Sequence, residues 1–563
     1  METSDQNISD PAIDQKNSRL PPDKTQGKTA RRLRKLSLVS IVLAVVGVIF
    51  SWLAPQEPLD VDEALAHVLI LLFGFMAICS GLSWCACQPD YPWYARYGPA
   101  VFVTAAILTF AFAFRIDNVS STLVPEFRLR WKAAKDEQLA APTTAKSRAP
   151  VDLRSTTKQD FPQFLGPQRT GLYNEIHLHR DWKTNPPVQL WRQDIGAGWS
   201  GFTVVNGFAV TMEQRGAKEL VTCYATKTGT LLWSHSVTAR HQTVLGGIGP
   251  RSTPLIHEGR VYALGATGIL RCLDGATGAE LWRDDLLKRY GVATPDEDFA
   301  QIGWGRANSP LVVDDLLVVP AGGATSNGTF QGVSLVAFDK LSGNLAWEAG
   351  TRQISYASPI LGDVGEQDQI VIVNEDNVTG HNPETGRVLW ELDWPGGSTS
   401  SANVSQAHLL AGDRLLLSKG YGGGARMLHL EKHAGGFKSH VVWSNKRVLK
   451  TKFTNVVTID DHAYGLSDGV MECIDLKDGK RQWKRGRYGH GQILGVNDVL
   501  LVQTESGEIV MLEVNPKRHR ELGSFEALAD TTWNNLCLYG TLLLVRNAQE
   551  AACYRVALAS ADE

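Results

Sequence analysis

Cations, aromatic residues and one amide occupy matching places in this chain, each just ahead of a short apolar strand. They are Trp199, Arg251, Arg306, Asn308, Tyr356, Lys452, His490 and Trp533. Guanidinium and ammonium groups bind anions through charge-assisted hydrogen bonds, and aromatic faces stack on cations and planar groups. If the fold gathers these strand starts, the set predicts a binding site for an anionic or sugar-like ligand. The alternative is that these side chains fill the interior of the fold, with arginine bonded to strand-end carbonyls.

The same positions offer little to chemistry that needs a metal or a catalytic carboxylate. None of the eight strand starts carries Asp or Glu, whereas a divalent cation prefers oxygen ligands with carboxylates among them. Asp296, Glu297 and Asp298 lie in an inserted loop, which we interpret as a solvated loop tip or, alternatively, a metal site. His177 and His179 give a second hint of metal binding. No nucleophile elbow, zinc-protease helix or dinucleotide fingerprint occurs, so we expect no catalytic residue and no metal.

These positions belong to a repeat that runs from about residue 188 to the chain end. Its unit is a short apolar strand, an Asp or a substitute, a Thr or Ser, a Gly and then a Trp, as in Asp274, Thr277, Gly278 and Trp282. The Asp side chain accepts backbone N–H bonds inside the turn, and the glycine supplies a positive φ. The repeat therefore predicts two antiparallel strands joined by a tight turn, with the tryptophan packed against the neighbouring sheet.

Eight such turns alternate with eight strand–turn–strand hairpins. Successive tryptophans from Trp191 to Trp483 lie 40 to 65 residues apart, and four short strands at this period make a propeller blade. The eighth turn lies too close to the chain end to supply a fourth strand, but an orphan strand at residues 188–191 carries a matching tryptophan. We predict an all-β, eight-bladed β-propeller over residues 160–563, closed by pairing this strand with the C-terminal blade, which removes an open edge.

Four cysteines share one strand position in different repeats: Cys223, Cys272, Cys473 and Cys553. Equivalent positions in separate blades should not meet. We therefore interpret these thiols as small buried apolar residues rather than as disulfide partners.

The Asp-x-x-Thr-Gly-x-x-x-Trp turns resemble the tryptophan-docking repeats of the quinoprotein-type propellers, also called pyrroloquinoline-quinone-like repeat propellers. The stretch from Asp160 to Pro167 resembles the lead-in of membrane-anchored or secreted members from planctomycete-like bacteria, and the stretch from Leu544 to Tyr554 resembles their closing blade. The resemblance covers about residues 160–560 and implies an eight-bladed propeller.

For function, the resemblance implies two classes of protein. One is the quinone-dependent dehydrogenases, which hold pyrroloquinoline quinone and calcium near the propeller axis and use an Asp as base. The other is the non-enzymatic propellers of outer-membrane assembly, which bind partner proteins. The strand starts lack carboxylates, and the propeller lacks the adjacent cysteine pair on which several of the enzymes stack the quinone. We therefore expect no cofactor, and pyrroloquinoline quinone with calcium is disfavoured.

Three apolar stretches precede the repeats, at residues 36–54, 64–87 and 98–114. A helix of about 20 residues crosses a bilayer core, so we predict three transmembrane helices after a disordered cytoplasmic tail at residues 1–35. Residues 115–159 are expected to be a linker to the propeller.

The cations Arg31, Arg32, Arg34 and Lys35 precede the first apolar stretch. By the positive-inside rule they place the tail in the cytoplasm and, after three crossings, the propeller outside. A cleaved signal peptide and a twin-arginine export signal are the alternatives.

Composition narrows the choice of partner. The chain has 563 residues and a formal net charge of −3, whereas nucleic-acid binders usually carry a basic excess, so we expect no nucleic acid. We predict a multi-pass inner-membrane protein whose periplasmic propeller is a non-catalytic interaction or scaffolding module. Its partners would be envelope proteins and the lipid bilayer. A pyrroloquinoline-quinone-dependent oxidoreductase and a receptor for an anionic or sugar-like ligand are the alternatives.

Overall fold

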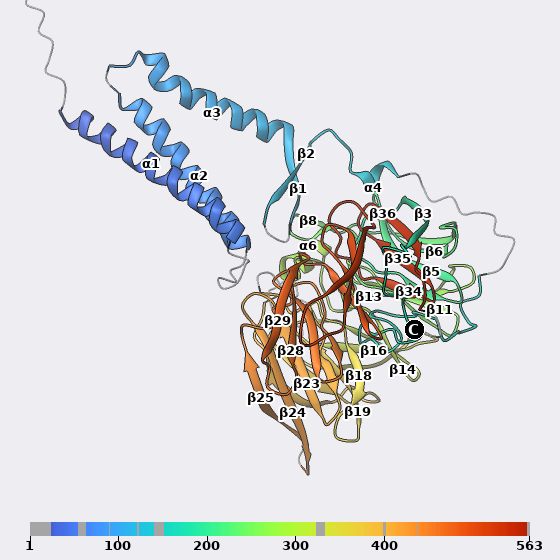
Figure 1. Cartoon of the computed structure of the whole chain (residues 1–563). Coiled ribbons are helices and arrows are strands. Elements are labelled where there is room, and N and C mark those ends of the chain that lie inside the picture. Colours follow the sequence, from blue (N-terminus) through green and yellow to red (C-terminus); the bar gives the residue numbers. More distant parts are fainter. Residues whose placement is uncertain are drawn as a thin grey trace, which may run out of the picture. The chain divides into compact units, whose positions relative to one another are not determined.

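The computed structural model describes residues 24–53, 63–88, 90–120, 123–139, 151–322, 333–397, 401–434 and 436–559 (Figure 1). The chain forms two compact units. The first comprises Met1–Arg115 and Thr122–Val124, and the second comprises Ile116–Ser121 and Pro125–Glu563. The first unit holds three helices, and the second holds the propeller.

The three helices are α1 (Lys24–Leu53), α2 (Glu63–Ala86) and α3 (Trp93–Ala113). α1 packs along α2, where the Ser37 hydroxyl donates to the Ala77 carbonyl at 3.3 Å. Among the described residues, two segments are long and apolar enough to cross a membrane: His67–Ala86 in α2 and the whole of α3. Two of the three predicted spans thus have a matching helix. The predicted span at residues 36–54 falls largely within α1, which is not among them, so its crossing stays a prediction.

The helices extend further than the apolar stretches predicted. α1 begins at Lys24, inside the predicted tail, and residues 1–23 lie outside the described residues. α3 begins at Trp93, directly after Pro92 at its N-cap, so the mainly aromatic residues 93–97 form the start of the helix ahead of the predicted apolar stretch.

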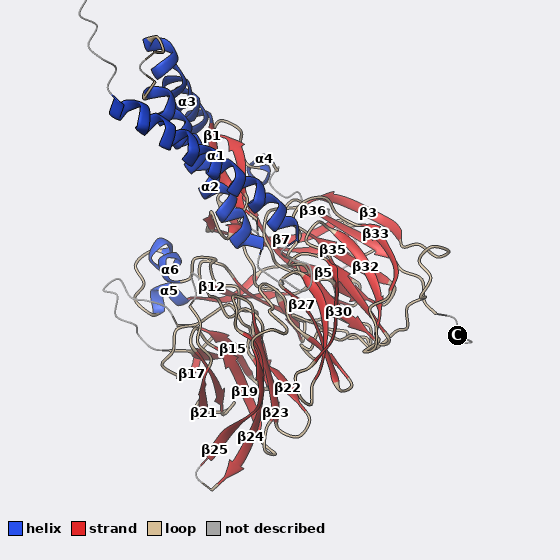
Figure 2. Ribbon diagram, turned by 60° about the vertical axis from the view of Figure 1, so that its left-hand side comes forward, coloured by secondary structure: helices blue, strands red, loops and turns tan. Residues whose placement is uncertain are grey.

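Eight four-stranded antiparallel sheets form the propeller (Figure 2). Blade 1 contains β4 (Thr203–Val205), β5 (Phe208–Arg215), β6 (Lys218–Ala225) and β7 (Leu231–Thr238). Blade 2 contains β10 (Leu255–His257), β11 (Arg260–Leu264), β12 (Ile269–Asp274) and β13 (Glu280–Asp285). Blade 3 contains β14 (Leu311–Val313), β15 (Leu316–Pro320), β16 (Leu335–Asp339) and β17 (Leu345–Ala349). Blade 4 contains β18 (Ile360–Asp363), β19 (Asp368–Val373), β20 (Asn377–His381) and β21 (Val388–Asp393).

The second half of the ring follows the same order. Blade 5 contains β22 (His408–Leu410), β23 (Arg414–Lys419), β24 (Gly424–His433) and β25 (Gly436–Asn445). Blade 6 contains β26 (Val457–Ile459), β27 (His462–Ser467), β28 (Val470–Asp475) and β29 (Arg481–Arg487). Blade 7 contains β30 (Gln492–Val496), β31 (Val499–Gln503), β32 (Glu508–Glu513) and β33 (Glu521–Glu526). Blade 8 contains β34 (Cys537–Tyr539), β35 (Leu542–Arg546), β36 (Glu550–Arg555) and, as its fourth strand, β3 (Val188–Asp194).

The N-terminal strand closes the ring. β3 pairs antiparallel with β36, and Trp191 lies opposite Cys553. The order β3-β36-β35-β34 therefore completes the eighth blade from both ends of the repeat region. This confirms the predicted eight-bladed, all-β propeller and the predicted closure.

Six junctions between blades share one packing unit, which we call the tryptophan dock. An indole on the last strand of one blade donates its N–H to a carbonyl in the turn of the next, at 2.7 to 3.2 Å. The pairs are Trp191–Thr226, Trp233–Gly275, Trp282–Lys340, Trp347–Pro383, Trp443–Leu476 and Trp483–Asn515. At Gly278, φ is +73°, and an added Cβ would lie 2.6 Å from the Trp233 ring. The turn glycine is therefore required by both its conformation and the close approach of the indole.

The junction between blades 4 and 5 lacks this dock. Trp390 donates instead to Gln369 of its own blade at 2.6 Å, because the matching turn of blade 5 lies at the far end of β24 and β25, each ten residues long. This hairpin projects from the ring in both views (Figures 1 and 2). Lys432 Nζ donates to the Gly365 carbonyl at 2.9 Å, and Phe437 packs against the core shared by blades 4 and 5.

The cysteines of the repeats occupy the predicted position. Cys223, Cys272 and Cys473 each lie opposite the docking tryptophan of their own blade, and Cys553 lies opposite Trp191. All four are fully buried and free, as is Cys537, the remaining cysteine of the propeller.

Part of the segment that was expected to be a linker is folded. β1 (Phe114–Val119) and β2 (Pro125–Leu129) form a hairpin, and the short helix α4 (Lys135–Gln138) follows. The Asp136 carboxylate is buried, pairs with Arg240 at 2.7 Å and accepts the Gly216 N–H at 3.2 Å. These contacts attach α4 to blade 1 and to the loop after it.

Candidate functional site at the channel mouth

Aromatic side chains fill the end of the propeller axis at which the chain enters the first strand of each blade, here called the channel mouth. They come from the entrance loops of blades 1, 3, 4, 6 and 8. Their ring centroids lie 4.6 Å apart for Trp199–Trp533, 5.5 Å for Trp533–Phe453, 5.4 Å for Phe453–Trp304 and 4.7 Å for Trp304–Tyr356. Because these loops belong to blades all round the ring, the five rings form a continuous aromatic plug across the axis.

Hydrogen bonds fix the plug in place. The Trp199 indole donates to the Gly246 carbonyl at 2.9 Å, and the Trp533 indole donates to Glu505 Oε1 at 2.8 Å. The backbone N–H of Trp304 donates to the Tyr356 hydroxyl at 3.3 Å, and burial raises the pKa of that hydroxyl. Buried polar groups of aromatic residues normally find such partners, so the plug is a packed and satisfied structure.

Arg306 is buried and paired with one carboxylate. Its Nε and Nη2 donate to the two oxygens of Asp298 at 3.1 and 2.9 Å, and Nη1 donates to the Ala321 carbonyl at 3.0 Å. Asp298 lies in α6 (Pro295–Gln301), which follows α5 (Leu286–Arg289) in the loop inserted between blades 2 and 3. The interpretation of the whole acidic group as a solvated loop tip is therefore wrong for Asp298, because its carboxylate neutralises Arg306.

The other cations of the set are also engaged with the protein. Arg251 donates to the carbonyls of Gly246 and Trp304, and burial lowers its pKa to about 9. Lys452 Nζ lies 5.6 Å from the centroid of the Tyr421 ring. The rings of His490 and Phe453 pack edge to face, with their centroids 5.6 Å apart. These contacts with aromatic rings and carbonyls hold the side chains in place around the channel mouth.

Asparagine side chains tie neighbouring entrance loops together. Asn308 Nδ2 donates to the carbonyls of Ser355 and Ala357 at 3.1 and 2.6 Å, which links blade 3 to blade 4. Asn534 Nδ2 donates to the carbonyls of Gly198 and Ser200 at 3.1 and 2.9 Å, which links blade 8 to blade 1. Asn308 and Asn534 thus make the same kind of contact, in which an asparagine side chain links the entrance loops of two neighbouring blades.

The opposite end of the axis is closed by the lead-in to the propeller. Its backbone bonds to the first strands of blades 1, 2 and 7. Arg169, 2% exposed, donates to the carbonyls of Ser309 and Pro310 at 3.2 and 2.8 Å, and its own carbonyl accepts from Gln406 of blade 5. Burial lowers the pKa of Arg169 to about 9. A guanidinium therefore occupies the axis at this end.

The structure brings together only part of the predicted site. Trp199, Tyr356 and Trp533 meet in the plug with His490 at its edge, whereas Arg251, Arg306, Asn308 and Lys452 serve the surrounding loops. Trp304, Phe453, Glu505 and Arg169 were missed. Trp304 and Phe453 are next to residues that were singled out by strand alignment, and extending each aligned position by a residue or two would have found them.

The residues at the mouth do not match the calcium–quinone centre that the sequence resemblance implies for the enzymes of this fold. Across the described ranges, no three His, Cys, Asp or Glu side chains are placed to hold a metal ion. Glu505, a carboxylate at the mouth, accepts the Trp533 indole and the His490 backbone N–H at 2.9 Å. The five packed rings also occupy the space at the axis that a bound pyrroloquinoline quinone would need.

A small cavity adjoins the plug. It encloses about 280 Å³ and is lined by Trp199, by Asp117 and Glu126 of the β1–β2 hairpin and by Asp530 of the loop before blade 8. Burial raises the pKa of Glu126, and the charges of Asp530 and Asp117 raise it further. Arg128, Lys132 and Lys135 line the same cavity, and Arg128 pairs with Asp117 at 2.6 Å, so the lining carries charges of both signs.

The chain is similar in sequence to propellers of one kind. A family profile described as outer membrane protein assembly factor BamB matches residues 188–288 and 217–485. The protein of that name from Yersinia pestis is 20% identical over 281 residues, which cover 46% of this chain and 60% of that protein. The protein of that name from Moranella endobia (strain PCIT) is 21% identical over 280 residues, or 46% and 63%. The chain thus spans less than two thirds of the length of either curated relative.

Solved enzymes share the fold. A europium-containing methanol dehydrogenase superposes with a TM-score of 0.53 at 12% identity, covering 71% of this chain and 99% of that chain. A quinohemoprotein alcohol dehydrogenase from Comamonas testosteroni gives a TM-score of 0.50 at 11% identity, covering 73% and 83%. The resemblance to planctomycete-like members stays a prediction. Since the family profile covers more than half of the chain and the ring carries the tryptophan docks, the chain belongs to the pyrroloquinoline-quinone-like repeat family (PQQ_2), described as outer membrane protein assembly factor BamB.

Proposed function

We propose that this chain is a membrane-anchored scaffold of the cell envelope whose extracytoplasmic propeller binds partner proteins and catalyses no reaction. The aromatic plug carries the proposal. Five rings fill the place where a propeller usually holds a small ligand, and Arg169 fills the other end of the axis. The name of the curated relatives, an outer membrane assembly factor, supports the same class.

The two alternative functions find less support. A quinone-dependent oxidoreductase is favoured by the solved structures that share the fold, but at 11 to 12% identity these bear on the fold alone. We propose that neither quinone nor calcium is bound. A receptor for an anionic or sugar-like ligand would need a cation at the mouth that can reach the ligand. Arg306 is neutralised by Asp298, and Arg251 is committed to carbonyls.

We propose an inner-membrane, multi-pass placement with three spans, the N-terminus in the cytoplasm and the propeller in the periplasm. α2 and α3 support two of the spans. α1 lies along α2, and Arg31, Arg32, Arg34 and Lys35 precede its apolar part, which supports the first span and the orientation.

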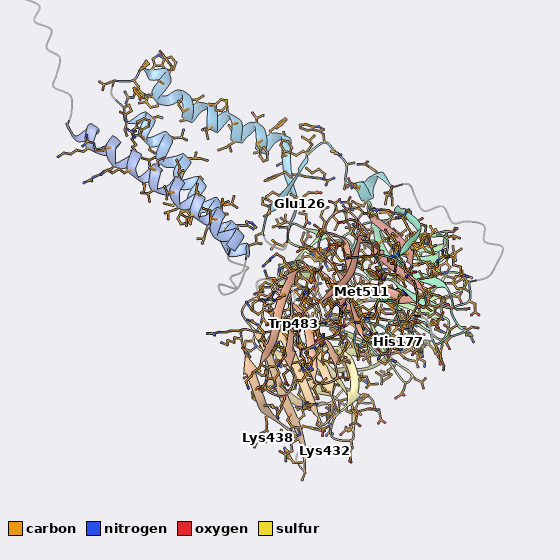
Figure 3. The ribbon with its side chains drawn as sticks, viewed as in Figure 1. Glu126, His177, Lys432, Lys438, Trp483 and Met511 are labelled. Atoms are coloured by element: carbon orange, nitrogen blue, oxygen red, sulfur yellow. The ribbon has the colours of Figure 1, made fainter. Side chains whose placement is uncertain are left out.

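We propose the β24–β25 hairpin as the element that binds the partner protein. β25 pairs with β24 on one side and forms the outer edge of its sheet, and its Val441 and Val442 are 58% and 50% exposed. An extended segment can add to such an edge through backbone hydrogen bonds. Lys438 lies towards the projecting end of the hairpin (Figure 3) and favours an acidic partner.

Site-specific photocrosslinking in cells tests this assignment. A photoreactive amino acid is placed at Val441 in the full chain and, as the matched control, at Val388, which is 38% exposed on the outer strand of blade 4. We expect a discrete protein adduct from position 441 alone, and we expect Val442→Asp to remove it. Equal adducts at both positions, or none at 441, would contradict the assignment.

Calorimetry tests the absence of a cofactor. The full chain is titrated with pyrroloquinoline quinone in the presence of Ca²⁺, and we expect no binding heat. Binding in the micromolar range or tighter would replace the scaffold with the oxidoreductase. A Trp533→Ala variant, which removes one ring of the plug, is the control. Binding of the quinone by this variant alone would show that packing of the rings is what blocks the channel.

A further inference from the structure

Large apolar side chains are exposed on the β1–β2 hairpin and in the turn that follows it, and one of them, Phe127, also lines the cavity beside Trp199. Ile116, Phe127 and Trp131 are 46%, 48% and 66% exposed. Arg130 and Lys132, on either side of Trp131, are also exposed. Single exposed apolar residues are ordinary on a protein surface, whereas a tryptophan flanked by cations beside further apolar residues marks a contact surface.

The hairpin is held in a fixed conformation. Asp117 of β1 pairs with Arg128 of β2 at 2.6 Å, so β2 runs back towards the residue at which β1 begins. After Trp131 the chain is fastened to the propeller through the buried Asp136 and its ion pair with Arg240 at 2.7 Å. The exposed residues therefore belong to an ordered element and not to a free tail.

The position of the hairpin in the chain indicates what covers it. α3 ends at Ala113 and β1 begins at Phe114, so no spacer separates the apolar helix from the hairpin. Trp side chains concentrate at the level of lipid headgroups, because their rings are apolar and their N–H groups are polar. Lys and Arg side chains near a bilayer surface are attracted to the phosphates of anionic lipids.

We propose that Ile116, Phe127 and Trp131 lie in the headgroup region of the bilayer, with Arg130 and Lys132 bound to anionic phosphates of the lipids. The hairpin is then a second, interfacial attachment to the membrane, directly after α3 in the chain. This inference rests on the membrane anchoring in the proposed function and not on the scaffold role.

Photocrosslinking to lipid tests the inference. The full chain, with a photoreactive amino acid at Trp131, is reconstituted into vesicles of phosphatidylcholine and phosphatidylglycerol. The control places the same group at Leu345, 44% exposed on the outer strand of blade 3. We expect a phospholipid adduct several-fold more abundant at 131 than at 345. A protein adduct at 131, or equal lipid adducts at both positions, overturns the inference.

The charge contribution is tested separately. The R130E/K132E double variant, carrying the probe at 131, is compared in vesicles with and without phosphatidylglycerol. We expect the unaltered pair of cations to raise the lipid adduct when phosphatidylglycerol is present, and the double variant to lose that increase. An unchanged increase overturns the role of the cations.

Alkaline carbonate extraction separates the two ways of failing. Release of the full chain from the vesicles would overturn the membrane anchoring in the proposed function. Retention of the chain without a lipid adduct at 131 would overturn the interfacial attachment alone.

Discussion

The six tryptophan docks and the junction between blades 4 and 5 fill the same kind of interface with different parts. In every dock the indole N–H is satisfied by a carbonyl of the turn that receives it. In five of the six docks the indole also lies against a turn glycine, whereas the Trp483 ring packs against His519. Between blades 4 and 5, Trp390 turns to its own blade, and Lys432 and Phe437 of the long hairpin reach back to blade 4 instead. Each interface between blades is thus packed with side chains, but different side chains can do this at different junctions.

The difference separates structural from functional parts of the sequence. The tryptophan docks repeat because the same turn and indole can join any two neighbouring blades. They therefore say little about what the protein binds. Two junctions lack a dock. Between blades 7 and 8, Phe525 packs against Tyr554 with ring centroids 4.8 Å apart, whereas at the junction between blades 4 and 5 the long strands β24 and β25 present an exposed strand edge. The irregular blade is therefore the place to look for a partner.

Removing a docked indole should have the largest effect on stability. Trp233→Ala leaves a cavity between blades 1 and 2 and is expected to lower the free energy of unfolding by about 3–5 kcal/mol. Trp233→Phe keeps most of the packing and loses the bond to Gly275, with an expected cost of about 1–2 kcal/mol. Denaturant unfolding of the full chain in detergent measures both. A cost below about 1 kcal/mol for Trp233→Ala would show that the dock is dispensable.

Turn glycines provide a matched pair. At Gly386, φ is +71° and an added Cβ would lie 2.4 Å from the Trp347 ring, whereas at Gly436, in blade 5, φ is +127° and the nearest atom is 3.7 Å away. We expect Gly386→Ala to cost about 2–4 kcal/mol and Gly436→Ala about 1 kcal/mol, the price of backbone strain alone. Thermal unfolding compares them. Equal losses would mean that indole contact adds nothing to the strain.

Blade 5 should also make the protein sensitive to acid. Burial lowers the pKa of His408, on the innermost strand of blade 5, from 6.5 to about 4. The unfolded chain therefore binds the proton more readily, and stability is lost as the pH falls from 6.5 towards 4. Between pH 7 and pH 5 the expected loss is about 2 kcal/mol.

The His408→Leu variant should lose about 2 kcal/mol less than the unaltered chain over the same pH change. Unfolding curves at both pH values measure the difference. Identical pH dependence in the two proteins would assign the acid sensitivity to other groups.

The contact that replaces the dock should have the smallest effect. Phe437→Ala removes a half-buried ring from the junction between blades 4 and 5, with an expected cost of about 1–2 kcal/mol. Val441→Ala on the exposed side of the same strand is expected to change stability by less than about 0.5 kcal/mol. Faster proteolysis of the hairpin in the Phe437 variant than in the Val441 variant would support the role of the ring, and equal rates would contradict it.

The ring could be predicted because its signals are local. The turn from Asp274 to Gly278 and the indole of Trp282 lie within nine residues of one another, and the orphan strand with Trp191 indicated closure. The long hairpin of blade 5 was visible only as a stretched repeat, because its contacts with Gly365 and the blade 4 core are distant in sequence.

The site was harder to predict because its partners come from loops. Strand alignment found Trp199, Tyr356 and Trp533, but it could not show that Asp298 of an inserted helix neutralises Arg306. Likewise, no local pattern around Arg169 indicated that its guanidinium reaches carbonyls of blade 3 across the axis. Electrostatic pairing between separate loops depends on tertiary structure that periodicity does not encode.

The pairing of β3 with β36 also sets an order of assembly. β3 is synthesised long before β36. Its hydrogen-bonding groups on that side therefore stay unpaired while the strands of the other seven blades are made. The ring can close only after its last strand, β36, has been made. A chain that ends before β36 would therefore leave β3 without its partner strand, and the open edge could pair with another chain.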